Sequence, residues 1–185
     1  MNNSVKKEIE KLIEAYKLDR SVEEFQEKID WKYISEYQTL SLNFIREFKD
    51  KVNWEEISIY QKLSENFIRE FKDKVNWFFI SSNQKLSENF IREFKDKINW
   101  HYISSVSLTE DFIREFQDKV DWCSISFFQK LSEDFIREFQ DKIDWDNIEK
   151  YQKITKKDIE ELEKQKIEEE LEKTRVKNKF QLIRF

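Results

Sequence analysis

The stretch Leu63–Trp77, L-S-E-N-F-I-R-E-F-K-D-K-V-N-W, decides the fold, because close copies of it recur along the chain. These copies occupy Leu40–Trp54, Leu86–Trp100, Leu108–Trp122 and Leu131–Trp145. From Trp31 to Trp145, successive tryptophans are 23, 23, 23, 22 and 23 residues apart. A fixed period of this length is the sequence signature of a stacked repeat array.

Composition narrows the fold class further. The 185 residues include no Gly and no Pro, 39% are charged, and the formal net charge is −5. Glycine-rich phosphate loops, nucleophile elbows and most tight hairpins need glycine at positive φ, so these structures are not expected. The sequence therefore predicts an all-α fold, an α-solenoid of short helix-turn-helix repeats with capping helices at both ends.

Three parts are expected along the chain. Residues 1–20 are predicted to form an N-terminal capping helix that begins with Ser4 as its cap, and residues 21–154 the tandem 23-residue helical repeats. Ser21–Asp30 is interpreted as a degraded first copy, because terminal repeats have only one covered side. Residues 155–185 are predicted to form a charged C-terminal helix and a basic tail.

Two helices of about 9 to 12 residues are expected in each repeat, each too short to be stable alone in water. In the repeat that contains Leu63–Trp77, Ser64 is placed to cap the first helix, called here the Phe helix. Asn76 is placed to cap the second, called here the Trp helix because it starts at Trp77. Asn76 can also end the preceding helix, since Asn tolerates left-handed angles. Burial of each Trp, about 150–250 Å² of surface, is expected to supply the contact between neighbouring repeats.

Some positions of the Trp helix hardly change between copies. Counting each Trp as offset zero, offsets 3, 4 and 7 carry Ile, Ser and Gln in nearly every copy, and they lie on the same side as the Trp. We expect the serines to permit close helix approach and the glutamines to form a hydrogen-bonded ladder between repeats. The recurring charges are expected to pair within one helix, as Glu65–Arg69, Arg69–Asp73 and Glu70–Lys74. The fourth repeat is one residue short, which predicts a tightened turn near Val106–Ser107.

Offsets 1, 2 and 5 lie on the opposite side and share almost nothing between copies. If the repeats had simply diverged in sequence at solvent-exposed positions, the outer positions of the Phe helix would vary between copies too. The Arg and Asp at those positions recur instead. A constant scaffold with one variable face is how repeat proteins build recognition surfaces. The candidate partner-binding residues are Tyr33, Glu36, Glu55, Glu56, Ile59, Phe78, Phe79, Ser82, His101, Tyr102, Ser105, Cys123, Phe127 and Lys150.

The favoured function is a non-enzymatic protein-binding or scaffold module with an unidentified protein partner. A self-assembling structural component, whose variable face packs against copies of the same chain, is the first alternative. Single-stranded nucleic-acid binding through the aromatic face and the basic tail, residues 173–185, is the second, although the face carries four acids against two lysines. The tail can also contact a membrane surface or fold back on the last helix.

Catalysis and metal binding have little support in the sequence. The one histidine, His101, and the one cysteine, Cys123, share an offset in adjacent repeats, but two ligands make a weak metal site. We expect no catalytic residue, no metal and no cofactor. One cysteine, no apolar signal-peptide core and no apolar run of about 20 residues favour a cytoplasmic protein without a membrane span.

The unit W-x-x-I-S-x-x-Q-x-L-S-E-x-F-I-R-E-F, as in Trp54–Phe71, resembles short helical tandem-repeat proteins encoded by AT-rich genomes, such as those of large DNA viruses and phages. The resemblance covers about Val22–Thr155. It implies an array fold and a viral protein that contacts host or virion components, and it implies no activity.

Overall fold

A computed structural model describes residues 3–15 and 21–182 of the chain. Every regular element within these residues is helical, which confirms the all-α solenoid of short helix pairs. The chain divides between Asn99 and Trp100 into two compact units. The first unit contains α1 (Asn3–Ala15), α2 (Val22–Lys28), α3 (Trp31–Tyr37), α4 (Leu42–Glu47), α5 (Trp54–Tyr60), α6 (Glu65–Glu70), α7 (Trp77–Asn83) and α8 (Glu88–Glu93). The second contains α9 (Trp100–Ile103), α10 (Glu110–Glu115), α11 (Trp122–Phe128), α12 (Glu133–Glu138), α13 (Trp145–Asn147), η1 (Ile148–Gln152) and α14 (Lys156–Leu182).

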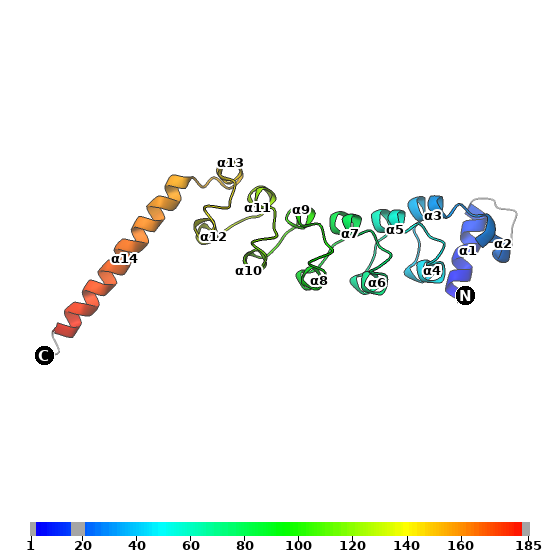
Figure 1. Ribbon diagram of the computed structural model, residues 1–185, viewed down its shortest axis with the longest axis horizontal. Coiled ribbons are helices and arrows are strands. Elements are labelled where there is room, and N and C mark those ends of the chain that lie inside the picture. The colour runs from blue at the N-terminus through cyan, green and yellow to red at the C-terminus, as the bar shows by residue number, and fades with distance from the viewer. Residues whose placement is uncertain (1–2, 16–20, 183–185) are drawn as a thin grey trace. The chain divides into compact units, whose positions relative to one another are not determined.

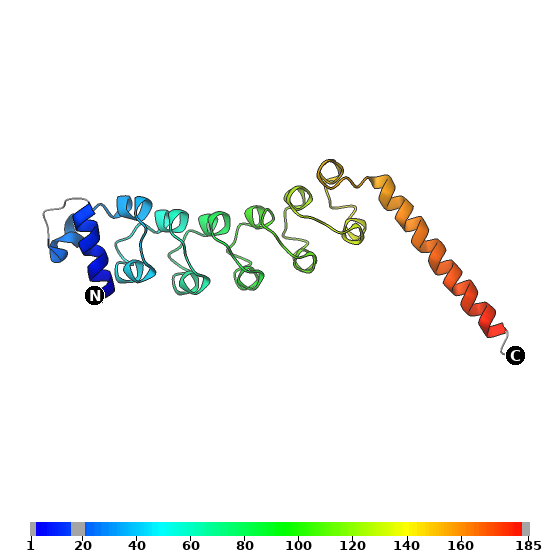
Figure 2. The ribbon, with the colours of Figure 1, turned by 180° about the vertical axis from the view of Figure 1, so that it is seen from behind.

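Within each unit the helices form two rows. In the first unit the Trp helices α3, α5 and α7 lie side by side, and the Phe helices α4, α6 and α8 form the other row (Figures 1 and 2). In the second unit α9, α11 and α13 alternate in the same way with α10 and α12 (Figure 1). Each repeat therefore offers one outer surface on its Trp helix and one on its Phe helix.

The helices are shorter than expected, with seven residues in α5 and six in α6. The expected 9 to 12 residues were wrong because Phe71 ends α6, and its carbonyl then accepts the N–H groups of both Lys74 and Val75. The chain turns tightly there, so the buried Val75 belongs to the turn after α6 and not to the helix itself.

The expected caps are mostly confirmed. The Ser64 hydroxyl accepts the Phe67 N–H at 3.3 Å, and the Asn76 side chain accepts the Phe78 N–H at 3.1 Å. Asn76 has extended angles, φ −86° and ψ 107°, so the idea that it ends the preceding helix in a left-handed conformation was wrong. Ser4 lies inside α1, which begins at Asn3, so its expected capping role was also wrong.

The fully buried core consists of phenylalanines and isoleucines, not of tryptophans. Phe67, Ile68 and Ile57 are inaccessible to solvent, whereas Trp54 is half-buried. The Trp54 indole lies against the rings of Phe67 and Phe71 in the following Phe helix. Its N–H donates to the Lys49 carbonyl at 2.8 Å, and this polar bond keeps the indole at the edge of the core. The expectation that the Trp is the buried centre of each contact was therefore wrong.

The Ser and Gln positions form the hydrogen bonds between repeats. The buried Ser58 hydroxyl donates to the Trp54 carbonyl at 2.7 Å and accepts the Asn76 N–H of the next repeat at 2.9 Å. Gln61 accepts the Leu40 N–H at 3.0 Å, and its amide nitrogen donates to carbonyls of the preceding repeat. The Gln ladder is thus confirmed, and the serines contribute their hydroxyl as well as their small size.

The charged side chains pair both within one helix and between repeats. Glu65–Arg69 is present at 3.8 Å, as expected. Glu70, however, pairs with Arg46 of the preceding repeat at 2.7 Å, and Asp73 pairs with Lys97 of the following one at 3.1 Å. The expected Arg69–Asp73 and Glu70–Lys74 pairs were wrong because α6 ends at Glu70, before another helical turn can form.

The shortened fourth repeat has a tightened turn, slightly earlier than Val106–Ser107. The Ser105 N–H donates to the Tyr102 carbonyl and the Val106 N–H to the Ile103 carbonyl, both over three residues. Gln129 of the next repeat donates to the Val106 carbonyl at 2.6 Å, so the Gln ladder adapts to the missing residue.

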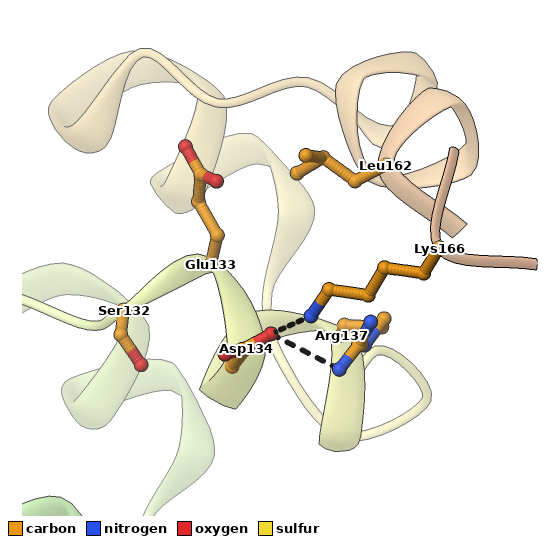
Figure 3. A pocket seen from close by; sticks show the side chains of 6 residues that line it. All are labelled: Ser132, Glu133, Asp134, Arg137, Leu162 and Lys166. Atoms are coloured by element: carbon orange, nitrogen blue, oxygen red, sulfur yellow. Dashed lines mark hydrogen bonds and ion pairs between the residues drawn. The ribbon is translucent and has the colours of Figure 1, made fainter. Parts of the chain in front are cut away.

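The C-terminal helix α14 is held against α12. Ile159 is buried and Leu162 half-buried. Figure 3 shows Asp134 of α12 between Lys166 of α14 and Arg137, and the Arg137–Asp134 distance is 3.0 Å. The bond from Lys166 lowers the pKa of the Asp134 carboxyl. Side chains of the basic tail beyond Arg175 lie outside the described residues.

Candidate partner-binding face

The outer side of the Trp helices, called here the variable face, is positioned by each helix's cap and its indole. The Asn or Asp cap fixes where the helix begins, and the buried Ile and Ser at offsets 3 and 4 fix which side points inward. The remaining offsets then point outward or toward the neighbouring Trp helix. The exposure of each predicted partner-binding residue therefore depends on its offset from the Trp.

Offset 1 is exposed in every Trp helix, as expected. These residues are Lys32, Glu55, Phe78, His101, Cys123 and Asp146. Offset 5 is mixed. Ser82, Phe127 and Lys150 are exposed, whereas Glu36, Ile59 and Ser105 are half-buried.

Offset 2 is less exposed than the sequence indicated. Tyr33 is exposed, but Glu56, Phe79 and Tyr102 are half-buried, and Ser124 is only 6% exposed. The cause is the neighbouring Trp helix, which lies beside this position. Lys32 at offset 1 of α3, for example, reaches Glu56 at offset 2 of α5, at 3.5 Å. Offset 2 therefore contributes more to the contact between repeats than to a free surface.

Sequence reasoning missed offset 6, which is exposed in all six repeats that contain a Trp. The residues there are Tyr37, Tyr60, Asn83, Val106, Phe128 and Tyr151. Four of these six are aromatic, and that recurrence in the sequence was a signal that could have identified the position. The variable face therefore comprises offsets 1, 5 and 6, with Tyr33 the clearest contribution from offset 2.

Aromatic rings of this face gather in both units. In the first unit the ring centres of Tyr33 and Tyr37 are 4.8 Å apart, and the hydrogen bond that the Tyr37 hydroxyl donates to the Glu36 carboxylate raises the pKa of the Tyr37 phenol. In the second unit the Phe127 ring lies 4.5 Å from both Phe128 and Tyr151. Exposed apolar groups in clusters, in contrast to single ones, mark contact surfaces.

His101 and Cys123 each contact an acid of the following repeat, and not each other. His101 Nδ1 lies 2.5 Å from Asp121, and the Cys123 sulfur lies 3.7 Å from Asp144. Partial desolvation of the exposed Cys123 side chain, followed by the charges of Asp144 and Asp121, raises the pKa of its thiol, which disfavours the nucleophilic thiolate. Within residues 3–15 and 21–182, no group of three or more His, Cys, Asp or Glu is placed to hold a metal ion.

Comparison with protein-family models, with curated proteins and with solved structures found no match to this chain. None of the helices in the described part of the chain combines the length and the apolar character needed to cross a membrane.

Proposed function

We propose that the chain is a non-enzymatic protein-binding scaffold, whose Trp helices present the variable face to a protein partner. The single observation that carries this proposal is the contrast between offsets. The inward Ile, Ser and Gln are nearly invariant between copies, whereas offsets 1, 5 and 6, which are exposed or half-buried, differ and include clustered exposed aromatics. Packing and hydrogen bonding between repeats explain why the inward Ile, Ser and Gln are constant. They give no reason for exposed aromatic rings at the outward offsets.

The charges on this face favour a protein over a nucleic acid. Lys32 and Lys150 at offsets 1 and 5 are accompanied by Glu36, Glu55 and Asp146 at the same offsets, and phosphate binding needs a net positive surface. Aromatic side chains with mixed polar neighbours are typical of protein interfaces. A viral setting, in contact with host or virion components, follows only from the resemblance of the repeat unit to proteins of AT-rich genomes.

A pair of variants tests the proposal. Replacing Tyr37, Tyr60 and Phe78 with Ser removes exposed rings from three Trp helices of the first unit, whereas replacing Lys49, Lys72 and Lys95 with Ser alters exposed residues that follow the Phe helices. Affinity capture with quantitative mass spectrometry is expected to show specific proteins that the control retains and the face variant loses. Equal capture by both variants, with unchanged circular dichroism, would contradict a binding role for this face.

A further inference from the structure

An aromatic cleft of about 450 Å³ lies between the end of α11 and η1 in the second unit. Phe127, Phe128 and Tyr151 line it together with Leu131 and Ile154. All three aromatic side chains are exposed, with between 41% and 56% of their surface open to solvent. The cleft therefore leaves three aromatic rings open to solvent beside the polar lining residues Gln129, Lys130 and Gln152.

Three irregular features of the backbone and side chains coincide at this cleft. η1, residues Ile148–Gln152, is a π-helix, and Lys153 after it has φ 62°, the one positive φ among the described residues. The Gln152 amide nitrogen is buried and has no hydrogen-bond partner in the described part of the chain, unlike the equivalent nitrogens of Gln61 and Gln129. π-Helical turns and strained residues concentrate at functional sites.

Lysines border the cleft. Lys130 lines it, and Lys150 and Lys153 flank the lining residues Tyr151 and Gln152. Lys150 Nζ lies 4.9 Å from the Tyr151 ring centre, whereas Lys130 and Lys153 form no ion pair with any residue that the structure describes. The acids of this repeat, Asp146 and Glu149, do not line the cleft. An acidic segment with apolar side chains would complement both the rings and the lysines.

The chain itself carries such a segment on α14. Ile167 and Leu171 are 60% and 55% exposed, one helical turn apart, within the sequence I-E-E-E-L-E at Ile167–Glu172. Lys164 and Lys166 precede this segment, and four of its six residues are glutamates. Because Lys166 is tied to Asp134 of α12, Ile167 and Leu171 lie beyond the last described contact of α14 with its own repeats.

We propose that the aromatic cleft receives the Ile167–Leu171 face of α14 from a second copy of the chain. Ile167 and Leu171 would cover the rings of Phe127 and Tyr151, while the glutamates meet the lysines. The contact joins two different surfaces, so it is heterologous, and its repetition builds a ring or a filament. It takes only Phe127 and Lys150 from the predicted partner-binding residues and does not depend on a foreign protein partner.

Two variants of the full chain test this contact by light scattering after size-exclusion chromatography and by sedimentation over a range of concentrations. The wild-type mass is expected to rise with concentration. Phe127→Ser/Tyr151→Ser removes the cleft and Ile167→Ser/Leu171→Ser removes the helix face, so each variant alone is expected to stay monomeric. A mixture of the two retains one intact cleft and one intact helix, and it is expected to give a 1:1 dimer and nothing larger.

A wild-type chain that stays monomeric at every concentration would overturn the proposal. So would a cleft variant that still associates alone, since that result indicates pairing of α14 with α14.

A charge exchange tests the same contact without removing apolar groups. Lys130→Glu/Lys153→Glu should weaken association, and adding Glu168→Lys/Glu170→Lys to the same chain should restore it; no restoration counts against the lysine–glutamate contact. The Tyr37, Tyr60 and Phe78 variant should associate like the wild type, which separates this inference from the proposed function.

Discussion

A buried serine hydroxyl at offset 4 of five repeats makes two hydrogen bonds, one to the carbonyl of its own tryptophan and one to the start of the next Trp helix. Ser58 holds the Trp54 carbonyl of its own helix and the Asn76 N–H at the start of the next Trp helix. A buried N–H that loses its acceptor is costly, so the hydroxyl matters more than the size of the side chain. Ser35, Ser81, Ser104 and Ser126 repeat the arrangement.

Ser58→Ala is therefore expected to lower the free energy of unfolding by about 1–3 kcal/mol, because the partly buried Asn76 N–H loses its acceptor. The exposed Ser82→Ala serves as the control and should change stability by less than about 0.5 kcal/mol. Urea unfolding followed by circular dichroism measures both. Equal effects would show that the hydroxyl of Ser58 contributes nothing.

Asp121 links the cap of α11 to the neighbouring His101 and gives a pH dependence of known sign. Burial would raise the pKa of Asp121, but hydrogen bonds with His101, Ser124 and Cys123 outweigh burial and lower it. Since the folded-state pKa is depressed, the stabilisation is present above the ordinary carboxyl value and is lost as pH falls through the lowered value.

Asp121→Asn should be less stable than the wild type at neutral pH, and the difference should shrink as Asp121 becomes protonated in acid. The variant keeps the cap, because Asn53 and Asn76 fill the same position elsewhere, and it loses only the charge. Urea unfolding at a series of pH values measures the difference. A gap that stays constant down to the most acidic pH at which the protein folds would refute this account.

The first part of α14 packs against the repeats, and the part that follows is exposed to solvent. Ile159 is 1% exposed against the repeats, and Ile167, eight residues later, is 60% exposed. Among the α14 side chains that the structure describes, up to Arg175, close packing against the repeats is found near the beginning of the helix.

Ile159→Ala is expected to cost about 2–5 kcal/mol through the cavity it leaves, whereas Ile167→Ala is expected to cost less than about 0.5 kcal/mol at dilute concentration. The two substitutions are chemically identical, so they control for each other. Thermal unfolding of both variants measures the contrast. Similar losses would mean that α14 packs along more of its length.

The sequence predicted the elements better than their lengths and surroundings. The tryptophan period and the Ser, Asn and Asp caps were enough to place the alternating helices, because both are local signals. The end of α6 at Glu70 depends on the Phe71 carbonyl, which bonds the turn that follows, and no periodicity contains that information.

The candidate face was predicted only in part for a similar reason. A helical wheel describes one helix in isolation, and offset 2 is half-buried because another Trp helix lies beside it. The same wheel assigned no role to offset 6, although Tyr37, Tyr60, Phe128 and Tyr151 are exposed there. Contacts between neighbouring repeats decide which outward positions stay open.

The whole repeat array depends on contacts between adjacent repeats, with hydrogen bonds and ion pairs that span about one period, as in Lys97–Asp73 and Gln84–Leu63. Stability in such arrays is close to a sum of repeat and neighbour terms. Removing one complete repeat should leave the remaining contacts in register.

Deletion of residues 55–77 is accordingly expected to preserve helicity per residue, while the slope of urea unfolding falls because less surface is exposed on unfolding. Deletion of residues 55–66, about half a repeat, should instead destroy the alternation and reduce helicity. Circular dichroism with urea titration distinguishes the two. Loss of folding in both chains would show that the array is not modular.

Residues 63–74 and 86–97 are identical, L-S-E-N-F-I-R-E-F-K-D-K, so their Phe helices offer the same partners to any neighbour. A chain whose repeats pair with the register shifted by one repeat would form the same ion pairs and the same packing of buried phenylalanines. A chain that pairs with a segment of another molecule would do so as well. Only the intervening segments, Val75–Lys85 and Ile98–Ser107, distinguish the correct neighbour from the wrong one. The side chains that vary between copies thus also make each repeat pair with its correct neighbour during folding. Making these side chains uniform would favour mispaired repeats and domain-swapped chains.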